Sequence, residues 1–103
     1  MYKLTIFIPD SHLESVKKAL FDAGAGKIGN YACCSWQVLG QGQFMPLAGN
    51  NAFIGQTDML ETLAEWRVEM VVVEDKVTAV LAALKQSHPY ETPAYDMIAM
   101  VDI

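Results

Sequence analysis

The sequence predicts an α+β fold, with an antiparallel sheet and two helices packed on one of its faces. Three observations point to this class. Segments with the alternation of strands stand near both ends of the chain, each helix-like segment lies between two strand-like segments, and the strand–helix–strand order occurs twice. A helix between two strands is the usual crossover connection within one sheet.

The chain begins with a strand and a helix. Residues 2–8 alternate between two faces, and one face collects four side chains, Tyr2, Leu4, Ile6 and Ile8. Ser11 followed by Glu14 fits a capping box, in which each side chain satisfies a free amide at the start of a helix. The apolar stripe of this helix follows at the spacing of one helical face: Leu13, Val16, Leu20 and Ala23. Gly24 is the expected end of the helix.

The middle of the chain predicts two more strands and a short helix. Residues 31–40 are predicted to form a strand, and a tight turn within 40–44 leads into a third short strand, which Pro46 limits to an edge or an end of the sheet. A stretch with turn chemistry follows. The segment TDMLETLAE at 57–65 then has the pattern of a short helix.

The second half repeats the strand–helix–strand order. Residues 65–73 alternate, with one face formed by Trp66, Val68, Met70 and Val72. Asp75 is a candidate cap for a second helix, whose buried stripe comprises Val77, Val80, Leu81 and Leu84. Pro89 ends this helix, because the residue before a proline is disfavoured in helical geometry. Residues 94–103 close the sheet as its last strand.

These units make a single domain, residues 1–103, with the ferredoxin-like order βαββαβ. Both helices are expected to cover the same face of the sheet. The other face carries Thr5 and Phe7 from the first strand, with a mixture of polar and apolar side chains elsewhere. Such a face is either hydrated or an interface between subunits.

The composition indicates a globular protein that self-associates. Hydrophobic residues make up 52% of the chain and charged residues 18%, which supplies a core and excludes a disordered chain. A domain of 103 residues leaves much of its chain surface exposed, so part of the apolar surface is expected to be buried against other subunits. A monomer with ordinary apolar surface atoms is the alternative.

Charge and cysteine content limit the partners and the compartment. A net charge of −5 without any cluster of Lys and Arg argues against nucleic-acid binding. No apolar run approaches the ~20 residues that span a bilayer, and the N-terminal segment is too short and too alternating for a signal peptide. Cys33 and Cys34 are neighbours, poorly placed to bond each other, so we expect a soluble cytoplasmic protein with reduced thiols.

The segment HPYETPAYD, residues 88–96, concentrates polar and aromatic side chains. His88 is a candidate metal ligand or proton carrier, with Tyr90 and Glu91 as ligand-binding partners. A structural role is the favoured interpretation, because the two prolines fix φ on both sides of the turn and His88 and Glu91 can bond free backbone groups near the helix end. The sequence leaves both roles open.

Two further segments hold candidate ligands. GAGKIG at 24–29 matches G-x-G-x-x-G, but a helix precedes it and a strand follows, which is the reverse of a dinucleotide-binding turn. Lys27 and Asn30 stay candidates for ligand contact, Lys27 with an anion. A buried small apolar residue is the favoured interpretation of Cys33, and a soft metal ligand that would converge with His88 between subunits is the alternative.

Three motifs taken together resemble a known family. They are GAGKIGNY (24–31), GQGQFMPLAGNNAFIG (40–55) and HPYETPAYD (88–96), and they are similar to motifs of the inserted domain of the Nif-three-like (YqfO-type) family. The resemblance covers nearly the whole chain. That domain has a fold akin to the PII nitrogen-regulatory proteins and the CutA divalent-ion-tolerance proteins, which are trimers. The resemblance implies a PII/CutA-like fold and favours a homotrimer built through the sheets, with a dimer or another contact as the alternative.

Full-length members of this family flank the domain with two lobes that carry a dinuclear metal site. This chain resembles the insert alone, as a stand-alone protein, and its only histidines are His12 and His88. Any hydrolase-like activity of the larger family therefore does not carry over. Two positions depart from the family pattern, since Ala52 stands where a proline is common and Thr92 stands where a second acid is common.

Catalytic chemistry has little support in the sequence, which shows no nucleophile with an attendant base and no pair of acids at an obvious catalytic spacing. We therefore expect a non-enzymatic, oligomeric interaction or small-ligand-sensing module whose ligand the sequence does not identify. The alternative is a CutA-like divalent-metal-binding protein that uses His88 and Glu91, with Cys33 as a third ligand. Such a metal ion is the one cofactor that the sequence suggests.

Overall fold

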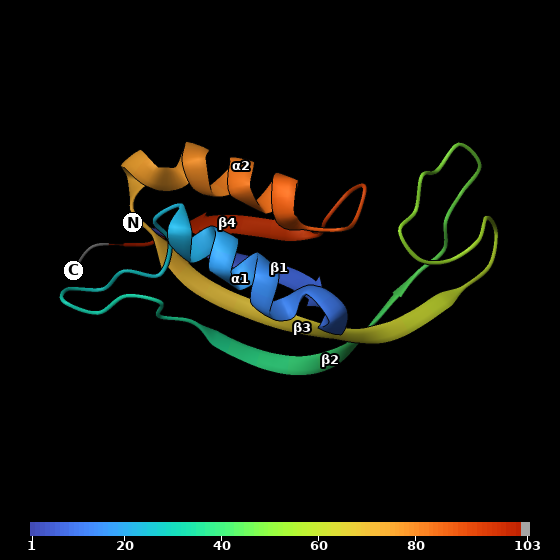
Figure 1. Cartoon of the computed structure of the whole chain (residues 1–103), viewed down its shortest axis with the longest axis horizontal. Coiled ribbons are helices and arrows are strands. Elements are labelled where there is room, and N and C mark those ends of the chain that lie inside the picture. Colours follow the sequence, from blue (N-terminus) through green and yellow to red (C-terminus); the bar gives the residue numbers. More distant parts are fainter. Residues whose placement is uncertain (102–103) are drawn as a thin grey trace.

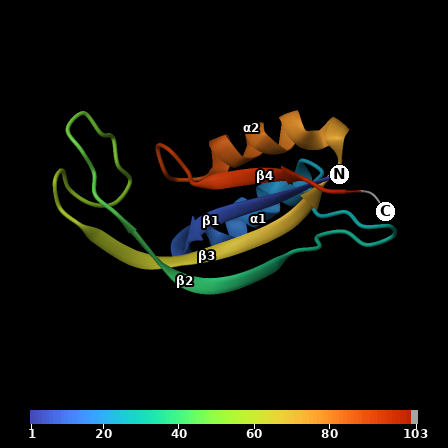
Figure 2. The same ribbon diagram turned by 180° about the vertical axis from the view of Figure 1, so that it is seen from behind.

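Four strands form one antiparallel sheet with two helices on the same face in the computed structural model, which describes residues 1–101 (Figure 1, and from behind in Figure 2). In chain order the elements are β1 (Tyr2–Pro9), a 3-10 turn (Asp10–His12), α1 (Leu13–Asp22), β2 (Trp36–Phe44), β3 (Glu61–Val72), a second 3-10 turn (Glu74–Lys76), α2 (Val77–Ser87) and β4 (Tyr95–Ala99). The order across the sheet is β2-β3-β1-β4, all antiparallel. The predicted ferredoxin-like α+β fold is therefore confirmed.

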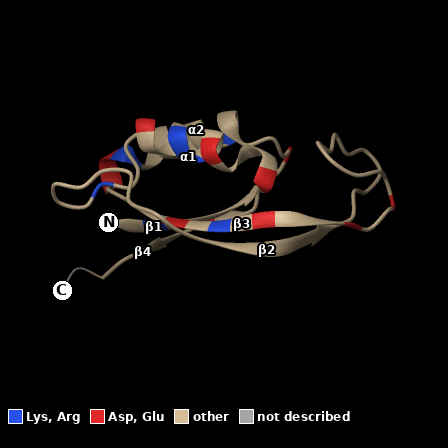
Figure 3. Cartoon of the chain, turned by 60° about the horizontal axis from the view of Figure 1, so that its bottom comes forward, with Lys and Arg blue, Asp and Glu red and all other residues tan. Residues whose placement is uncertain are grey.

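The core lies between the sheet and the two helices, which Figure 3 shows as separate layers. The central strand β1 buries three of the four side chains predicted for its inner face, Leu4, Ile6 and Ile8. Ile6 pairs with Val68 on β3, so the inner faces of the two strands coincide. The helices contribute the predicted apolar stripes, of which Leu13, Val16, Leu20, Val80 and Leu84 are buried. The spacing of apolar residues along the chain therefore correctly predicted the buried face of these helices and strands.

Both helices begin without the side-chain caps that the sequence suggested. Neither N-cap residue, His12 or Lys76, makes a side-chain capping hydrogen bond. The Ser11 hydroxyl lies 2.8 Å from His12 Nδ1, so the predicted capping box with Glu14 is wrong. Asp75 lies within the second 3-10 turn and does not cap α2. A 3-10 turn leads into each helix instead, which is a common way to tighten a helix end.

The strand β2 corrects two sequence predictions at once. The end of the strand predicted at 31–40 and the tight turn predicted within 40–44 belong to one strand, which begins only at Trp36. Gly40 and Gly42 stay within the ladder, opposite β3, and form no turn between two strands. Ladder hydrogen bonds to β3 outweigh the weak local turn preference of the glycines.

The helix predicted at 57–65 is wrong, because β3 begins at Glu61 within that segment. The pairing partner of Glu61 is Phe44, the last residue of β2, so the hairpin extends well beyond the core. Tertiary pairing here overrides a short helical pattern that has no core to pack on. The last strand is also shorter than predicted, and residues 102–103 of that prediction lie outside the described residues.

Two loops stand at opposite ends of the sheet (Figure 1). Loop 24–35 lies at the end that also carries both termini, and loop 45–60 lies at the far end of the β2–β3 hairpin. Because β2 begins at Trp36, the two cysteines lie in loop 24–35 and outside the strand predicted for them. Cys33 has a φ of 59°, in the left-handed region, and its side chain is exposed, so the expectation of a buried residue is wrong for it. Within residues 1–101, no helix has the length and hydropathy to cross a membrane.

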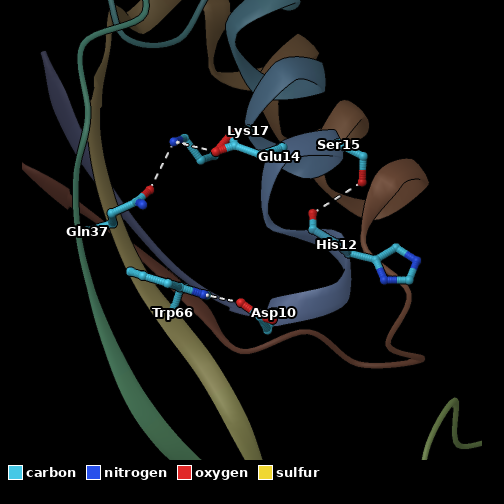
Figure 4. Close-up of polar contacts among 7 residues, drawn as sticks. All are labelled: Asp10, His12, Glu14, Ser15, Lys17, Gln37 and Trp66. Carbon is cyan, nitrogen blue, oxygen red and sulfur yellow. Dashed lines mark hydrogen bonds and ion pairs between the residues drawn. The ribbon is translucent and has the colours of Figure 1, made fainter.

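Polar contacts tie the β2–β3 hairpin to the start of α1 (Figure 4). Trp66 Nε1 donates to Asp10 Oδ1 at 2.8 Å, and Lys17 Nζ donates to Gln37 Oε1 at 2.9 Å. The first bond joins β3 to the 3-10 turn after β1, and the second joins α1 to β2. Because Trp66 is the neighbour of Glu65 in the chain, this brace also helps to place the part of β3 that carries Glu65.

Candidate functional site

His88 fastens the turn 88–94 to the central strand. The side chain is only 5% exposed. Its Nε2 lies 2.8 Å from the carbonyl oxygen of Phe7, and its Nδ1 lies 3.1 Å from the amide nitrogen of Tyr90. A carbonyl only accepts and an amide N–H only donates, so the ring proton is on Nε2 and the imidazole is neutral. Burial lowers the pKa of His88 and favours this neutral form.

The end of α2 agrees with the sequence prediction. The helix stops at Ser87, and His88 is extended with a ψ of 134°, as the following proline requires. This change of direction points the His88 ring at β1 and starts the turn that carries Tyr90 and Glu91. The structural role that the sequence left open for His88 therefore has a geometric basis, since both ring nitrogens are bonded to backbone groups.

Tyr90 connects the turn to β3. Its hydroxyl donates to Glu65 Oε2 at 2.8 Å. Its ring centroid lies 4.9 Å from that of His88 and 6.0 Å from that of Phe44. Burial, and then the hydrogen bond to the Glu65 carboxylate and the negative charge of that group, raise the pKa of Tyr90, so the phenol stays a neutral donor.

Gly42 makes this contact sterically feasible. It lies on β2 across from β3, and a Cβ at this position would overlap the carboxylate of Glu65. A side chain here would therefore push the carboxylate away from Tyr90. By contrast, a Cβ on Gly40 would have its nearest neighbour, the Glu65 carbonyl oxygen, at 3.9 Å. The absence of a side chain therefore matters for the Glu65–Tyr90 contact at Gly42 and not at Gly40.

Loop 45–60 is folded on itself and touches the turn at few points. Asn50 organises it, because Nδ2 donates to the Leu47 carbonyl at 2.7 Å and to Thr57 Oγ1 at 2.8 Å, while Oδ1 accepts the Ala52 amide at 3.0 Å. One hydrogen bond links loop and turn, from the Asn51 amide to Glu91 Oε2 at 3.1 Å.

Aromatic side chains complete the contact between loop and body. The Phe53 ring lies 6.5 Å from the Tyr90 ring and 5.3 Å, edge-on, from the His12 ring. Phe53 remains 49% exposed in this position. The loop is therefore held against the turn by a small number of contacts that a ligand or a neighbouring surface can change.

A cavity of about 540 Å³ lies between the loop and the turn, within the range of about 300–1,000 Å³ typical of small-molecule sites. Its ionisable groups are Glu65, Glu91 and Tyr90, and Phe44 and Phe53 add aromatic rings. The remaining lining residues are Gln43, Pro46, Leu47, Ala48, Gly49, Asn50, Ala52, Ile54, Thr92 and Ala94. A mostly apolar hollow with a few convergent polar groups is the general form of a ligand site.

The predicted site residues fall into two groups. Tyr90 and Glu91 line the cavity, and His88 lies directly behind Tyr90. Lys27, Asn30 and Cys33 lie in loop 24–35, at the opposite end of the sheet, and all three are exposed (Figure 1). Within residues 1–101, no group of three His, Cys, Asp or Glu side chains is arranged to hold a metal ion.

Sequence reasoning missed Glu65, Phe44 and Phe53 as cavity residues. Glu65 stands at a polar position of a strand, where a solvated side chain is the ordinary expectation. Phe44 ends one strand and Phe53 lies in a turn-rich segment. No spacing in the sequence links these residues to Tyr90, which becomes their neighbour only through the sheet order.

Comparison with known proteins agrees with this fold. No family model matches the chain. A protein of Halalkalibacterium halodurans named GTP cyclohydrolase 1 type 2 homolog is 44% identical over 102 residues, which are 99% of this chain and 27% of that protein. The crystal structure of a Bacillus cereus protein related to NIF3 has a TM-score of 0.83 at 38% identity, over 98% of this chain and 26% of its own.

CutA1 from Pyrococcus horikoshii is similar over 100% of this chain and 86% of its own, with a TM-score of 0.71. At 19% identity that likeness shows the fold alone. The chain spans about a quarter of the length of the curated relatives that it matches. It is similar to a segment within the longer chains of the NIF3-related proteins, and it shares the fold of CutA1.

Proposed function

We propose that the chain is a non-enzymatic, oligomeric module that senses a small ligand in the cavity between loop 45–60 and the turn 88–94. The observation that carries the proposal is the construction of the cavity. One wall belongs to the body of the fold, through Glu65 and Tyr90, and the other belongs to a loop that a single hydrogen bond and aromatic contacts hold in place. A ligand that touches both walls favours one position of the loop, which a partner protein can detect.

The proposal of a module without catalysis is supported by the chemistry of the cavity. Among the described residues that line it there is no Ser, Cys, His or Lys. The one hydroxyl bonded to a carboxylate there is that of Tyr90, and its raised pKa keeps the phenol protonated and therefore a poor nucleophile. The relatives bear the name of a GTP cyclohydrolase homolog, but this chain corresponds to about a quarter of their length. The cyclohydrolase name therefore carries no activity over to this segment.

The proposal of an oligomer is supported by the open face of the sheet. Trp36 pairs with Glu69, Val38 with Arg67, and Ile98 with Lys3, so these apolar side chains lie on the face that the helices do not cover. Trp36, Val38 and Ile98 are 59%, 44% and 56% exposed. Apolar groups on the two edge strands of an uncovered face favour a homotrimer built through the sheets, with a dimer as the alternative.

The proposal is tested by light scattering together with thermal unfolding of the chain against a panel of nucleotides, amino acids, amines and divalent metals. We expect a trimer, and a rise in melting temperature with at least one compound that Tyr90→Ala abolishes and Tyr31→Ala preserves, because Tyr31 is exposed at the other end of the molecule. A monomeric mass with no compound-induced shift would refute the proposal.

A divalent-metal site at His88, Glu91 and Cys33 is the second proposal, and it needs two chains. Cys33 lies at the opposite end of the sheet from Glu91, so only a neighbouring subunit can bring a cysteine to the turn. His88 must also release one of its two backbone hydrogen bonds to become a ligand. Calorimetric titration of Zn²⁺ into the wild type and His88→Ala tests this, and equal affinities contradict it.

A cytoplasmic location is likewise a proposal. It is supported by the free thiols of Cys33, which is exposed, and Cys34, which is half-buried. Exposed thiols persist in a reducing compartment. Fractionation of cells followed by thiol labelling of the intact protein checks it, and recovery of the two cysteines in an oxidised form counts against it.

A further inference from the structure

We propose that the cavity recognises a small molecule with a cationic nitrogen attached to an aromatic or similarly flat apolar group. The inference rests on the proposed ligand-sensing function and names the class of ligand for the same site. It follows from the charges that line the cavity, from the helix end beside it and from the aromatic walls.

The charge of the cavity is negative and is not neutralised by the protein. Glu65 and Glu91 both line it, and each has one carboxylate oxygen bonded to an uncharged donor, the Tyr90 hydroxyl and the Asn51 amide. In the part of the chain that the structure describes, neither glutamate forms an ion pair. A cation that enters therefore meets two carboxylates, each with an oxygen still free to accept a hydrogen bond.

The basic side chains nearest the cavity do not line it. His12 contacts the Phe53 ring, the neutral His88 ring lies behind Tyr90, and Arg67, two residues from Glu65 on β3, forms an ion pair with Glu69. No Lys, Arg or His is among the described lining residues. Loop 45–60 contains Asp58 and no Lys, Arg or His, and Figure 3 shows no Lys or Arg at the loop end. Low-dielectric walls of one charge sign concentrate ligands of the opposite sign and repel ligands of the same sign, such as phosphates.

The end of α2 adds negative potential to the same place. The helix ends at Ser87, and Tyr90 and Glu91 follow within four residues. The last carbonyl groups of a helix carry a partial negative charge, which stabilises cations near them. Lys85 in the last turn is exposed and does not line the cavity, so solvent and salt screen the effect of its positive charge on the cavity.

The apolar requirement comes from three rings. The ring centroids of Phe44 and Phe53 lie 6.0 and 6.5 Å from that of Tyr90, close enough for a flat ligand to contact more than one ring. A cation next to such a ring gains a further attraction to the ring face. The Tyr90 ring is fixed from behind by His88 and at its hydroxyl by Glu65, so little side-chain entropy is lost on binding.

The experiment uses probes of matched shape and different charge. They are 2-phenylethylamine, 2-phenylethanol and phenylacetate, with GTP as an anionic nucleotide, each titrated into the whole chain by heteronuclear NMR. We expect the amine to shift the amide signals of Asn51, Glu91 and Thr92, the alcohol to bind more weakly, and the two anions to leave these signals unchanged. Glu91→Gln is expected to weaken the amine about tenfold and the alcohol less than about twofold.

Glu65→Gln removes the other carboxylate charge of the cavity and should also weaken binding of the amine. Glu69→Gln is the matched control. Glu69 lies on the same strand, pairs with Lys3 and does not line the cavity, so its variant should bind the amine like the wild type. If either anion binds at these amides as tightly as the amine, or if both cavity variants retain full affinity for the amine, the charge inference is overturned and the ligand-sensing site stands. If no probe binds, the charge inference and the proposed site fall together.

Discussion

Glu65 and Tyr90 are joined by a 2.8 Å hydrogen bond although 25 residues and the whole of α2 separate them in the chain. The bond connects the strand that carries the β2–β3 hairpin to the turn that enters β4. Both residues line the cavity, so the contact that stabilises the turn also shapes the candidate site.

The Gly42→Ala substitution should break this contact. The added Cβ overlaps the Glu65 carboxylate, which must rotate away from the Tyr90 hydroxyl. We expect a loss of about 1 kcal/mol in the free energy of unfolding, the usual contribution of one hydrogen bond. Urea unfolding measures it.

Gly40→Ala is the matched control, because its Cβ would have 3.9 Å of clearance on the same strand and should cost little. In a Tyr90→Phe background the cost of Gly42→Ala should largely disappear, since the hydrogen bond is already absent. Equal destabilisation by Gly42→Ala with and without the Tyr90 hydroxyl would contradict the assigned role of Gly42.

His88 should make stability depend on pH. Its pKa lies below the ordinary value of 6.5 in the folded protein because the ring is buried. As pH falls below about 6.5, the unfolded chain takes up a proton at this position while the folded chain does not, so the free energy of unfolding decreases until the lowered pKa is reached. Above this window His88 adds no pH dependence.

Urea unfolding at several pH values between about 7.5 and 5 measures this slope. His88→Gln should reduce the slope at the cost of lower stability at neutral pH, because one or both backbone contacts are lost. His12→Gln removes the ring contact with Phe53 and only the smallest of the causes that act on the His88 pKa, so most of the slope should stay in place. An unchanged slope in His88→Gln would show that the buried imidazole is not its source.

Gly26→Ala should destabilise the protein strongly. Gly26 has a φ of 76°, and a Cβ would lie 2.8 Å from Phe21 Cε1 and 2.9 Å from the Cys34 carbonyl oxygen. Left-handed strain and the steric clash together should cost about 2–4 kcal/mol. Gly29→Ala is the control, since its φ is 56° with open space around the Cβ, and only the strain of about 1 kcal/mol is expected.

Asn50→Ala should loosen loop 45–60 without unfolding the domain. The three hydrogen bonds of the Asn50 side chain lie within the loop and far from the core, so the melting temperature should change little. The Ala52 amide loses its acceptor and should exchange its hydrogen about tenfold faster. Asn51→Ala is the control, because the backbone amide and not the side chain of Asn51 bonds Glu91. Equal exchange in all three proteins would contradict the role given to Asn50.

Local patterns in the amino-acid sequence were enough to predict which faces of the helices and strands are buried. The alternation of Leu4, Ile6 and Ile8, the stripes of the two helices and the break before Pro89 all reappear in the structure. These signals are local, because periods of 2 and 3.6 residues place apolar side chains on one face before any partner is present. That information was sufficient to predict the ferredoxin-like class.

The length of the β2–β3 hairpin and the residues that meet at the site depend instead on contacts between distant parts of the chain. Segment 57–65 has a helical pattern of its own, yet Glu61 becomes the start of β3, since pairing with β2 supplies hydrogen bonds that an isolated short helix cannot match. Glu65 reaches Tyr90 only because the sheet order brings β3 close to the turn after α2. Side-chain contacts across so many residues depend on topology and packing, which no local period in the chain encodes.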